Sequence, residues 1–188
     1  MKKHIPNILT MFRVLLVPVF LWIVYISRLQ DYQIWATAIF IVASITDYFD
    51  GMLARKFNVI SNFGKIMDPL ADKLLVISAL AALFNPMGYI GLTVVLVIAA
   101  REIGITILRD HYIKKKIYIA ANNWGKVKTV SQMVGIIAVL IYASVLHYFQ
   151  LEASEVIKLI IRIYFWITAA ITVFSGMNYI IVKKSKKN

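Results

Sequence analysis

Six long apolar stretches follow one another along this chain, and short polar connections separate them. Their approximate ranges are 8–27, 32–54, 67–85, 88–109, 124–148 and 155–182. A helix needs about 20 mostly apolar residues to cross the hydrocarbon core of a bilayer, and only helices and closed barrels satisfy their backbone hydrogen bonds there. The sequence therefore predicts an all-α, polytopic membrane protein with six transmembrane helices, folded as a single integral membrane domain over residues 1–188.

The composition supports this prediction and excludes several other classes of protein. Hydrophobic residues make up 61% of the chain and the mean hydropathy is +0.76, which is not typical of a soluble domain. Because the chain has no cysteine, any metal must be held by oxygen or histidine ligands, and oxygen ligands favour hard cations. The net charge of +12 lies at the ends of the apolar stretches, so we expect anionic membrane lipids as partners and no nucleic acid.

Basic residues also indicate how the protein is oriented in the membrane. Lysine and arginine in short loops stay on the cytoplasmic side of a membrane. In the predicted arrangement the basic residues of the loops and tails gather on one side, and only Arg28, Lys158 and Arg162 fall on the other. Both termini and the connection between the second and third stretches are therefore expected to face the cytoplasm. Residues 1–13 are a candidate for a short interfacial segment, retained rather than cleaved as a signal peptide, and residues 183–188 for a basic tail.

Four aspartates lie at this predicted cytoplasmic end. Asp47 and Asp50 close the second stretch, while Asp68 and Asp72 open the third. Residues three or four apart share one face of a helix, so two neighbouring helices could offer all four carboxylates to a single cavity. A carboxylate is costly near hydrocarbon unless a cation compensates its charge. Bound divalent metal is the simplest explanation for this cluster.

Small residues accompany the aspartates. Gly51 and Ala54 share a helix face with Asp47, where they leave room for a ligand, and Gly64 is expected to loosen the connection between the two stretches. Pro69 suits the first turn of a helix, so we expect Asp68 to lie near a helix N-terminus, where the helix dipole favours an anion.

The aspartate cluster has two functional interpretations. Hard cations held by carboxylates commonly serve phosphate chemistry, which indicates a nucleotide or pyrophosphate substrate at the membrane surface. Arg55, which follows Ala54, is suited to make a forked contact with such a phosphate. The alternative is a proton or ion relay in a transporter. A relay favours acids at mid-membrane depth on several helices, whereas these acids gather at one interface.

At these residues the sequence resembles the CDP-alcohol phosphotransferase family, membrane enzymes with six spans that transfer a phosphoalkyl group from a CDP-linked donor to an alcohol and release CMP. The matching pattern is Asp47-x2-Asp50-Gly51-x2-Ala54-Arg55-x8-Gly64-x3-Asp68-x3-Asp72. The resemblance implies two bound divalent ions, Mg²⁺ or Mn²⁺, with Asp72 as the catalytic base. The implied metal ligands are Asp47, Asp50, Asp68 and Asp72. The implied donor-binding residues are Asn7, Asp47, Gly51, Ala54, Arg55 and Gly64.

Three further stretches resemble members of that family that use glycerol 3-phosphate. They are Ile5-Pro6-Asn7 with Leu9-Thr10 and Arg13, Ala100-Arg101-Glu102-Ile103 with Leu108-Arg109, and Gly125-Lys126-Val127-Lys128-Thr129 with Gln132-Met133. The resemblance implies transfer of a phosphatidyl group from CDP-diacylglycerol to glycerol 3-phosphate, giving phosphatidylglycerophosphate and CMP by two-metal-assisted in-line attack. It also implies a homodimer in the bacterial cytoplasmic (inner) membrane.

Cationic side chains separate from the CDP pocket are needed to capture the acceptor, because glycerol 3-phosphate is a dianion. The candidates, at the expected cytoplasmic ends of the fourth and fifth helices, are Arg101, Arg109, Lys126 and Lys128. These cations could instead only enforce membrane topology. Two other functions stay open: the same chemistry with serine, inositol phosphate or phosphatidylglycerol as acceptor, or an ion-coupled membrane transporter.

Overall fold

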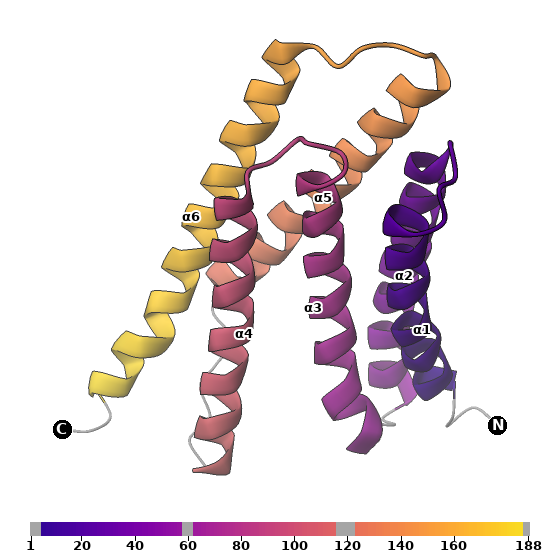
Figure 1. Cartoon of the computed structure of the whole chain (residues 1–188). Helices are drawn as coiled ribbons and strands as arrows, with labels where there is room; N and C mark the ends of the chain where they lie inside the picture. The colour runs from indigo at the N-terminus through magenta and orange to yellow at the C-terminus, as the bar shows by residue number, and fades with distance from the viewer. Residues whose placement is uncertain (1–4, 58–61, 116–122, 186–188) are drawn as a thin grey trace.

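A computed structural model shows the chain as a bundle of long helices (Figure 1). It describes residues 5–57, 62–115 and 123–185, which form six helices and no strand. The helices are α1 (Ile5–Tyr25), α2 (Tyr32–Phe57), α3 (Asn62–Phe84), α4 (Leu92–Lys114), α5 (Asn123–Tyr148) and α6 (Glu155–Ser185). The predicted all-α class is confirmed, and each helix covers most of one predicted apolar stretch.

The outer surface of the bundle is apolar. Large apolar side chains are exposed on every one of the six helices, among them Trp22, Leu96 and Ile160, each more than half exposed. An apolar surface of this extent suits hydrocarbon rather than water. Within the described residues, the segments Trp124–Tyr148 and Glu155–Met177 are long and apolar enough to cross a membrane. The chain is thus a membrane protein, and the number of six spans stays a prediction.

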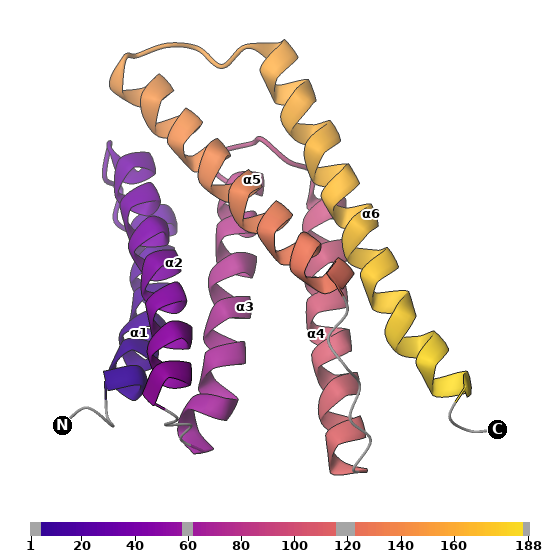
Figure 2. The same ribbon diagram turned by 180° about the vertical axis from the view of Figure 1, so that it is seen from behind.

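The first helix has a central place among the first three. α1 packs on both α2 and α3, whereas α2 and α3 touch each other only slightly. α5 runs obliquely across the bundle and packs on α2, α3 and α6, and α4 lies between α3 and α6 (Figures 1 and 2). The two helices that carry the aspartates are therefore joined mainly through α1 and α5.

Apolar side chains from all six helices form one core. Phe20 of α1 meets Phe40 of α2 with ring centroids 6.5 Å apart, and Leu80, Ile136 and Phe165 are fully buried in the same cluster. Burial of such side chains provides the non-directional stabilisation that holds the helices together. Polar contacts set the register as well: the Thr37 hydroxyl of α2 lies 2.8 Å from the Ser144 hydroxyl of α5.

Helix ends rich in basic residues lie together. α1 and α3 begin at the end of the bundle where α2, α4 and α6 end (Figure 1). We call it the charged end of the bundle. The arrangement is the one expected for an even number of membrane crossings, and the side of the membrane that the charged end faces stays a prediction.

Several predicted boundaries are wrong in detail. Helix α3 begins at Asn62, so Gly64 lies inside its first turn rather than in the connection, and Pro69 lies well inside the helix. Asp68 is therefore not next to a helix N-terminus. A proline inside a helix removes one backbone hydrogen bond, whereas a proline in the first turn does not. The predicted start was too late because it placed Pro69 in the first turn.

Two further boundaries lie beyond the predicted positions. Helix α4 continues to Lys114, five residues past the predicted end. Residues 5–13 form the first part of α1, continuous with the rest of that helix, and their expected place at the membrane interface stays a prediction.

Candidate active site

A buried arginine of α1 joins the two helices that carry the aspartates. The Nη1 atom of Arg13 lies 2.9 Å from Oδ1 of Asp47 on α2 and 3.1 Å from Oδ1 of Asp72 on α3. The Arg13 side chain is fully buried, whereas the side chains of Asp47 and Asp72 are 45% and 44% exposed. The guanidinium therefore compensates both carboxylates from within the bundle and leaves them accessible from outside it.

Helix periodicity places these three charged side chains together. Arg13 lies on the buried stripe of α1, between Thr10 and Val17, at the spacing that puts residues on one helix face. Asp47 comes four residues after the buried Ala43 on α2, and Asp72 three residues before the buried Leu75 on α3. The three core stripes thus converge on one ion cluster. Burial of an arginine is costly without anionic partners, which the two carboxylates supply.

Two of the four predicted metal ligands are brought together by this contact. Asp47 and Asp72 reach the same nitrogen atom from different helices. Asp50 lies in α2 and Asp68 in α3, but their side chains fall outside those that the structure describes. Among the described side chains no group of three or more acidic or histidine ligands occurs. The carboxylate oxygens that are described fit a hard divalent cation, because Mg²⁺ and Mn²⁺ prefer such ligands.

The predicted donor-binding residues fall on the same helices. Asn7 lies in α1, Gly51, Ala54 and Arg55 in α2, and Gly64 in α3. Their side chains lie outside the described set. Their role toward CDP therefore stays a prediction.

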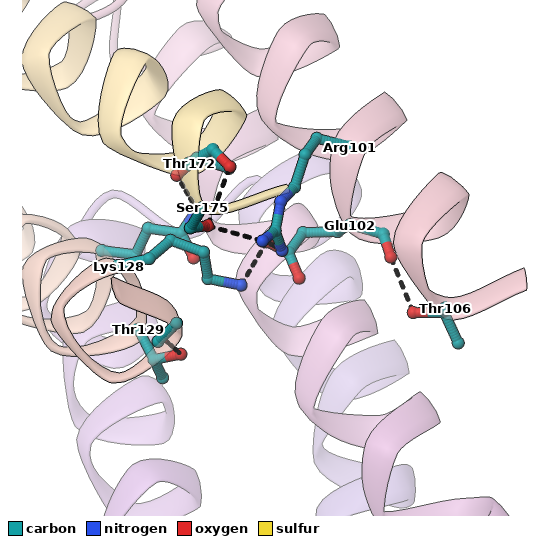
Figure 3. A network of polar contacts seen from close by, with 9 residues as sticks. Arg101, Glu102, Thr106, Lys128, Thr129, Thr172 and Ser175 are labelled. Atoms are coloured by element: carbon teal, nitrogen blue, oxygen red, sulfur yellow. Dashed lines mark hydrogen bonds and ion pairs between the residues drawn. The ribbon is translucent and has the colours of Figure 1, made fainter. Parts of the chain in front are cut away.

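A second polar cluster joins α4, α5 and α6 (Figure 3). One oxygen of Glu102, Oε1, accepts a hydrogen bond from Nζ of Lys128 and lies 3.3 Å from Nη1 of Arg101. Nη2 of Arg101 donates to Oγ of Ser175 at 2.6 Å, and Ser175 Oγ donates to the Thr172 carbonyl at 3.0 Å. The side chains of Glu102, Lys128 and Arg101 are only 8%, 9% and 12% exposed. We call Arg101, Glu102, Lys128 and Ser175 the basic cluster.

Two of the four predicted acceptor-binding residues belong to this cluster, and two do not. Arg101 and Lys128 meet at Glu102, whereas Arg109 and Lys126 are exposed on α4 and α5. Arg101 also lies near the middle of α4, not at its end as expected, because the helix continues to Lys114. Exposed cations are well hydrated, so Arg109 and Lys126 are better suited to attract an anion than to fix its position.

Helix α3 connects the helices of the two polar clusters. It carries Asp72, the partner of Arg13. Helix α3 also packs on both α4 and α5. The carboxylates that suit a divalent cation and the buried cations that suit a phosphate thus lie on helices that pack on one another.

Arg13 and Glu102 are the site residues that the sequence argument missed. Both stand in stretches that carry the family resemblance, but neither was assigned a role there. The sequence does indicate a special role for Arg13, since it is a lone arginine in helical register with Thr10, Val17 and Phe20 within an apolar stretch. The partner of Glu102 lies 26 residues away on another helix, and no local pattern indicates it.

The fold and the site together define a class of protein. It is a helical membrane protein that has paired carboxylates suited to a divalent cation and, on helices that pack on α3, buried cations suited to a phosphate. This arrangement fits an enzyme that acts on phosphate esters. The chain belongs to the CDP-alcohol phosphatidyltransferase family, whose model matches residues 3–174. The predicted family and the predicted enzyme class are confirmed.

Similar proteins occur in several bacteria and share the name CDP-diacylglycerol–glycerol-3-phosphate 3-phosphatidyltransferase. The protein of Rickettsia typhi is 35% identical over 179 residues, which cover 94% of this chain and 95% of the relative. That of Haemophilus influenzae is 34% identical, with coverage of 98% and 95%. That of Bacillus subtilis is 36% identical, with coverage of 94% and 93%. The similarity thus extends over nearly the whole chain.

Proposed function

We propose that this protein transfers a phosphatidyl group from CDP-diacylglycerol to glycerol 3-phosphate, giving phosphatidylglycerophosphate and CMP. The observation that carries the proposal is that the Asp47–Asp72 pair and the basic cluster lie on helices that pack on one another. The reaction needs one site for a pyrophosphate with its metal ions and a second for a phosphate monoester. The names of the full-length relatives support this choice of donor and acceptor.

In this proposal the site formed by the aspartates binds the donor, CDP-diacylglycerol. Two divalent ions, Mg²⁺ or Mn²⁺, are held by Asp47, Asp50, Asp68 and Asp72. When bound, such ions neutralise the pyrophosphate and stabilise the departing CMP. The CDP moiety contacts residues of α1, α2 and α3, and the acyl chains stay in the lipid beside the apolar bundle surface. The donor-binding residues are Asn7, Asp47, Gly51, Ala54, Arg55 and Gly64.

The chemical step in the proposal is a single in-line displacement. Asp72 accepts the proton of the 1-hydroxyl group of glycerol 3-phosphate as the oxygen attacks the β-phosphorus of the donor. A bond from that oxygen to phosphorus forms, the phosphoanhydride bond breaks, and CMP leaves with the bridging oxygen. The contact of 3.1 Å with Arg13 holds the Asp72 side chain toward α1 and so limits its rotamers.

The acceptor binds through its phosphate at the basic cluster. Arg101 and Lys128 are buried, so their electrostatic interaction with a dianion is screened less than it would be in water. The exposed Arg109 and Lys126 draw the dianion toward the site, because positive surface charge raises the local concentration of anions.

The cellular arrangement follows from the same assignment. Glycerol 3-phosphate and CMP are water-soluble, so the charged end faces the cytoplasm and the protein lies in the bacterial inner membrane, among anionic lipids. The family resemblance also supports a homodimer, which light scattering of the purified protein in detergent tests.

One assay tests the proposed reaction against its alternatives. Purified protein is mixed with CDP-diacylglycerol, Mg²⁺ or Mn²⁺, and one acceptor at a time: glycerol 3-phosphate, serine, inositol phosphate or phosphatidylglycerol. We expect CMP and phosphatidylglycerophosphate only with glycerol 3-phosphate and a divalent ion. CMP release with serine alone would overturn the acceptor assignment. No release with any acceptor would reject the enzyme and favour an ion-coupled transporter.

A further inference from the structure

We propose that Glu102 is a positioning residue for the acceptor, orienting Lys128 and Arg101 so that both cations bind one phosphate group. The inference rests on the proposed function, because it assigns the phosphate of glycerol 3-phosphate to the basic cluster. It concerns a carboxylate that has no direct contact with substrate and acts through its two basic partners.

The geometry of Glu102 brings two cations to one point. A single oxygen, Oε1, is the partner of both Lys128 on α5 and Arg101 on the same helix as Glu102. The Glu102 side chain is 8% exposed, so these charge-assisted contacts are shielded from water. Lys128 would otherwise have a flexible four-carbon stem and many rotamers. The shared oxygen restricts both cationic groups to one place.

The remaining donors of the two cations suit an anion. An ammonium group carries three N–H donors and a guanidinium group five. The Nε atom of Arg101 makes no hydrogen bond with any described residue, but it is buried against Gly176 of α6. The donors left for an anion are therefore on the ammonium group of Lys128 and on the Nη atoms of Arg101. Arg101, Lys128 and Glu102 together carry one net positive charge, so the cluster attracts an anion. Two buried cations without Glu102 would repel each other and carry a larger desolvation cost.

Helix α6 completes the cluster by holding Arg101 from the opposite side. Ser175 is fully buried and accepts a hydrogen bond of 2.6 Å from Arg101. The next residue, Gly176, gives the guanidinium room, because a Cβ atom there would come within 3.2 Å of Nε of Arg101. Arg101 is thus fixed by Glu102 on one side and by α6 on the other.

A purely structural counter-ion would behave differently from a positioning residue. Loss of a counter-ion lowers stability and weakens donor and acceptor use alike. Loss of a positioning residue raises the KM for glycerol 3-phosphate and leaves the KM for CDP-diacylglycerol near its original value. The rise in KM also depends on Lys128, because the positioning residue acts through that side chain.

The test is a double-mutant cycle on Glu102 and Lys128. Glu102→Gln keeps the size of the side chain and removes its charge, and we expect it to raise the KM for glycerol 3-phosphate about tenfold. In the Lys128→Met background the same change should raise it less than about threefold, because contacting residues are non-additive. Glu102→Asp should restore part of the loss. Thr106→Val is the matched control: Thr106 lies one turn away on α4 and bonds only to the Glu102 backbone carbonyl among the described residues, so the KM should not change.

Binding without turnover separates this inference from the proposed reaction. Glycerol 3-phosphate alone should raise the Tm of the purified wild-type protein, and the rise should be much smaller for Glu102→Gln. If the wild type binds glycerol 3-phosphate but releases no CMP, the proposed reaction fails and the positioning role stands. If Glu102→Gln does not fold, Ser175→Ala, which removes the other anchor of Arg101, should raise the same KM about threefold. Additive effects in the cycle, equal changes in both KM values, or no Tm rise in the wild type would overturn the inference.

Discussion

Arg13 and Asp72 are 59 residues apart in sequence, and Nη1 of Arg13 donates a hydrogen bond of 3.1 Å to Oδ1 of Asp72. The same nitrogen contacts Asp47 at 2.9 Å. Helix α1 therefore supplies the cation that joins the two acidic helices, which touch each other only slightly. A divalent metal held by the exposed oxygens of these carboxylates would compete with Arg13 for the same negative charge.

Removal of the Arg13 charge should lower stability and strengthen the effect of divalent ions. Arg13→Gln leaves Asp47 and Asp72 without their buried partner, and we expect a loss of about 3 kcal/mol in the free energy of unfolding. Added Mn²⁺ should then raise the Tm of Arg13→Gln more than that of the wild type, because an external cation replaces the lost charge. Thermal unfolding in detergent with and without Mn²⁺ measures both effects. Arg162→Gln, an exposed change on α6, is the control, and an equal Mn²⁺ response in all three proteins would contradict the competition.

Asp72→Asn should abolish catalysis while substrate binding survives. The amide keeps the size of the side chain but cannot accept the proton of the acceptor hydroxyl, so CMP release should fall at least about a hundredfold. Binding of CDP-diacylglycerol should remain, and it is measured as the rise in Tm that the donor causes. Asp31→Asn at the opposite end of the bundle is the matched control. Turnover close to that of the wild type would remove Asp72 from the role of base.

Arg101→Ala and Lys128→Ala should affect the acceptor more than the donor. Each change removes a buried cation, and we expect the KM for glycerol 3-phosphate to rise at least about tenfold, with less than about threefold change in the KM for CDP-diacylglycerol. Lys126→Ala lies two residues from Lys128 but removes an exposed charge, so its effect should be small and should fade at high salt. Initial rates at varied acceptor concentration measure these effects. An unchanged acceptor dependence for Lys128→Ala would dismiss it as a phosphate ligand.

Gly135→Ala should destabilise the bundle without a selective effect on either substrate. A Cβ atom at Gly135 would overlap Cε1 of Tyr164 and lie 3.4 Å from Cζ of Phe165, so the Tyr164 ring or the helices themselves must shift. We expect a loss of about 1–3 kcal/mol in the free energy of unfolding. The second change Tyr164→Ala removes the overlapping ring and should recover part of that loss. Thermal unfolding of the single and double variants tests this contact, and no effect of Gly135→Ala would contradict it.

The helices could be predicted from local sequence because each apolar stretch is nearly continuous and the bilayer requires helical hydrogen bonding. The aspartate pattern likewise indicated the family by resemblance, since every position and gap of the motif matches. Where the prediction was wrong, it relied on a local preference: Pro69 favoured a helix start, but α3 had already begun at Asn62. Helix packing in the rest of the bundle tolerates the lost hydrogen bond, which a local rule cannot anticipate.

The sequence by itself thus determined the helical membrane class, the approximate helix boundaries and the presence of aspartates at one end of two neighbouring helices. Only the tertiary structure decided that α1 packs on both acidic helices, that Arg13 joins Asp47 to Asp72, and that Lys128 meets Arg101 at Glu102. The physical reason is range. Hydrophobic periodicity and backbone hydrogen bonding act over a few neighbouring residues, whereas the choice of partner for a buried charge depends on how distant core stripes pack together.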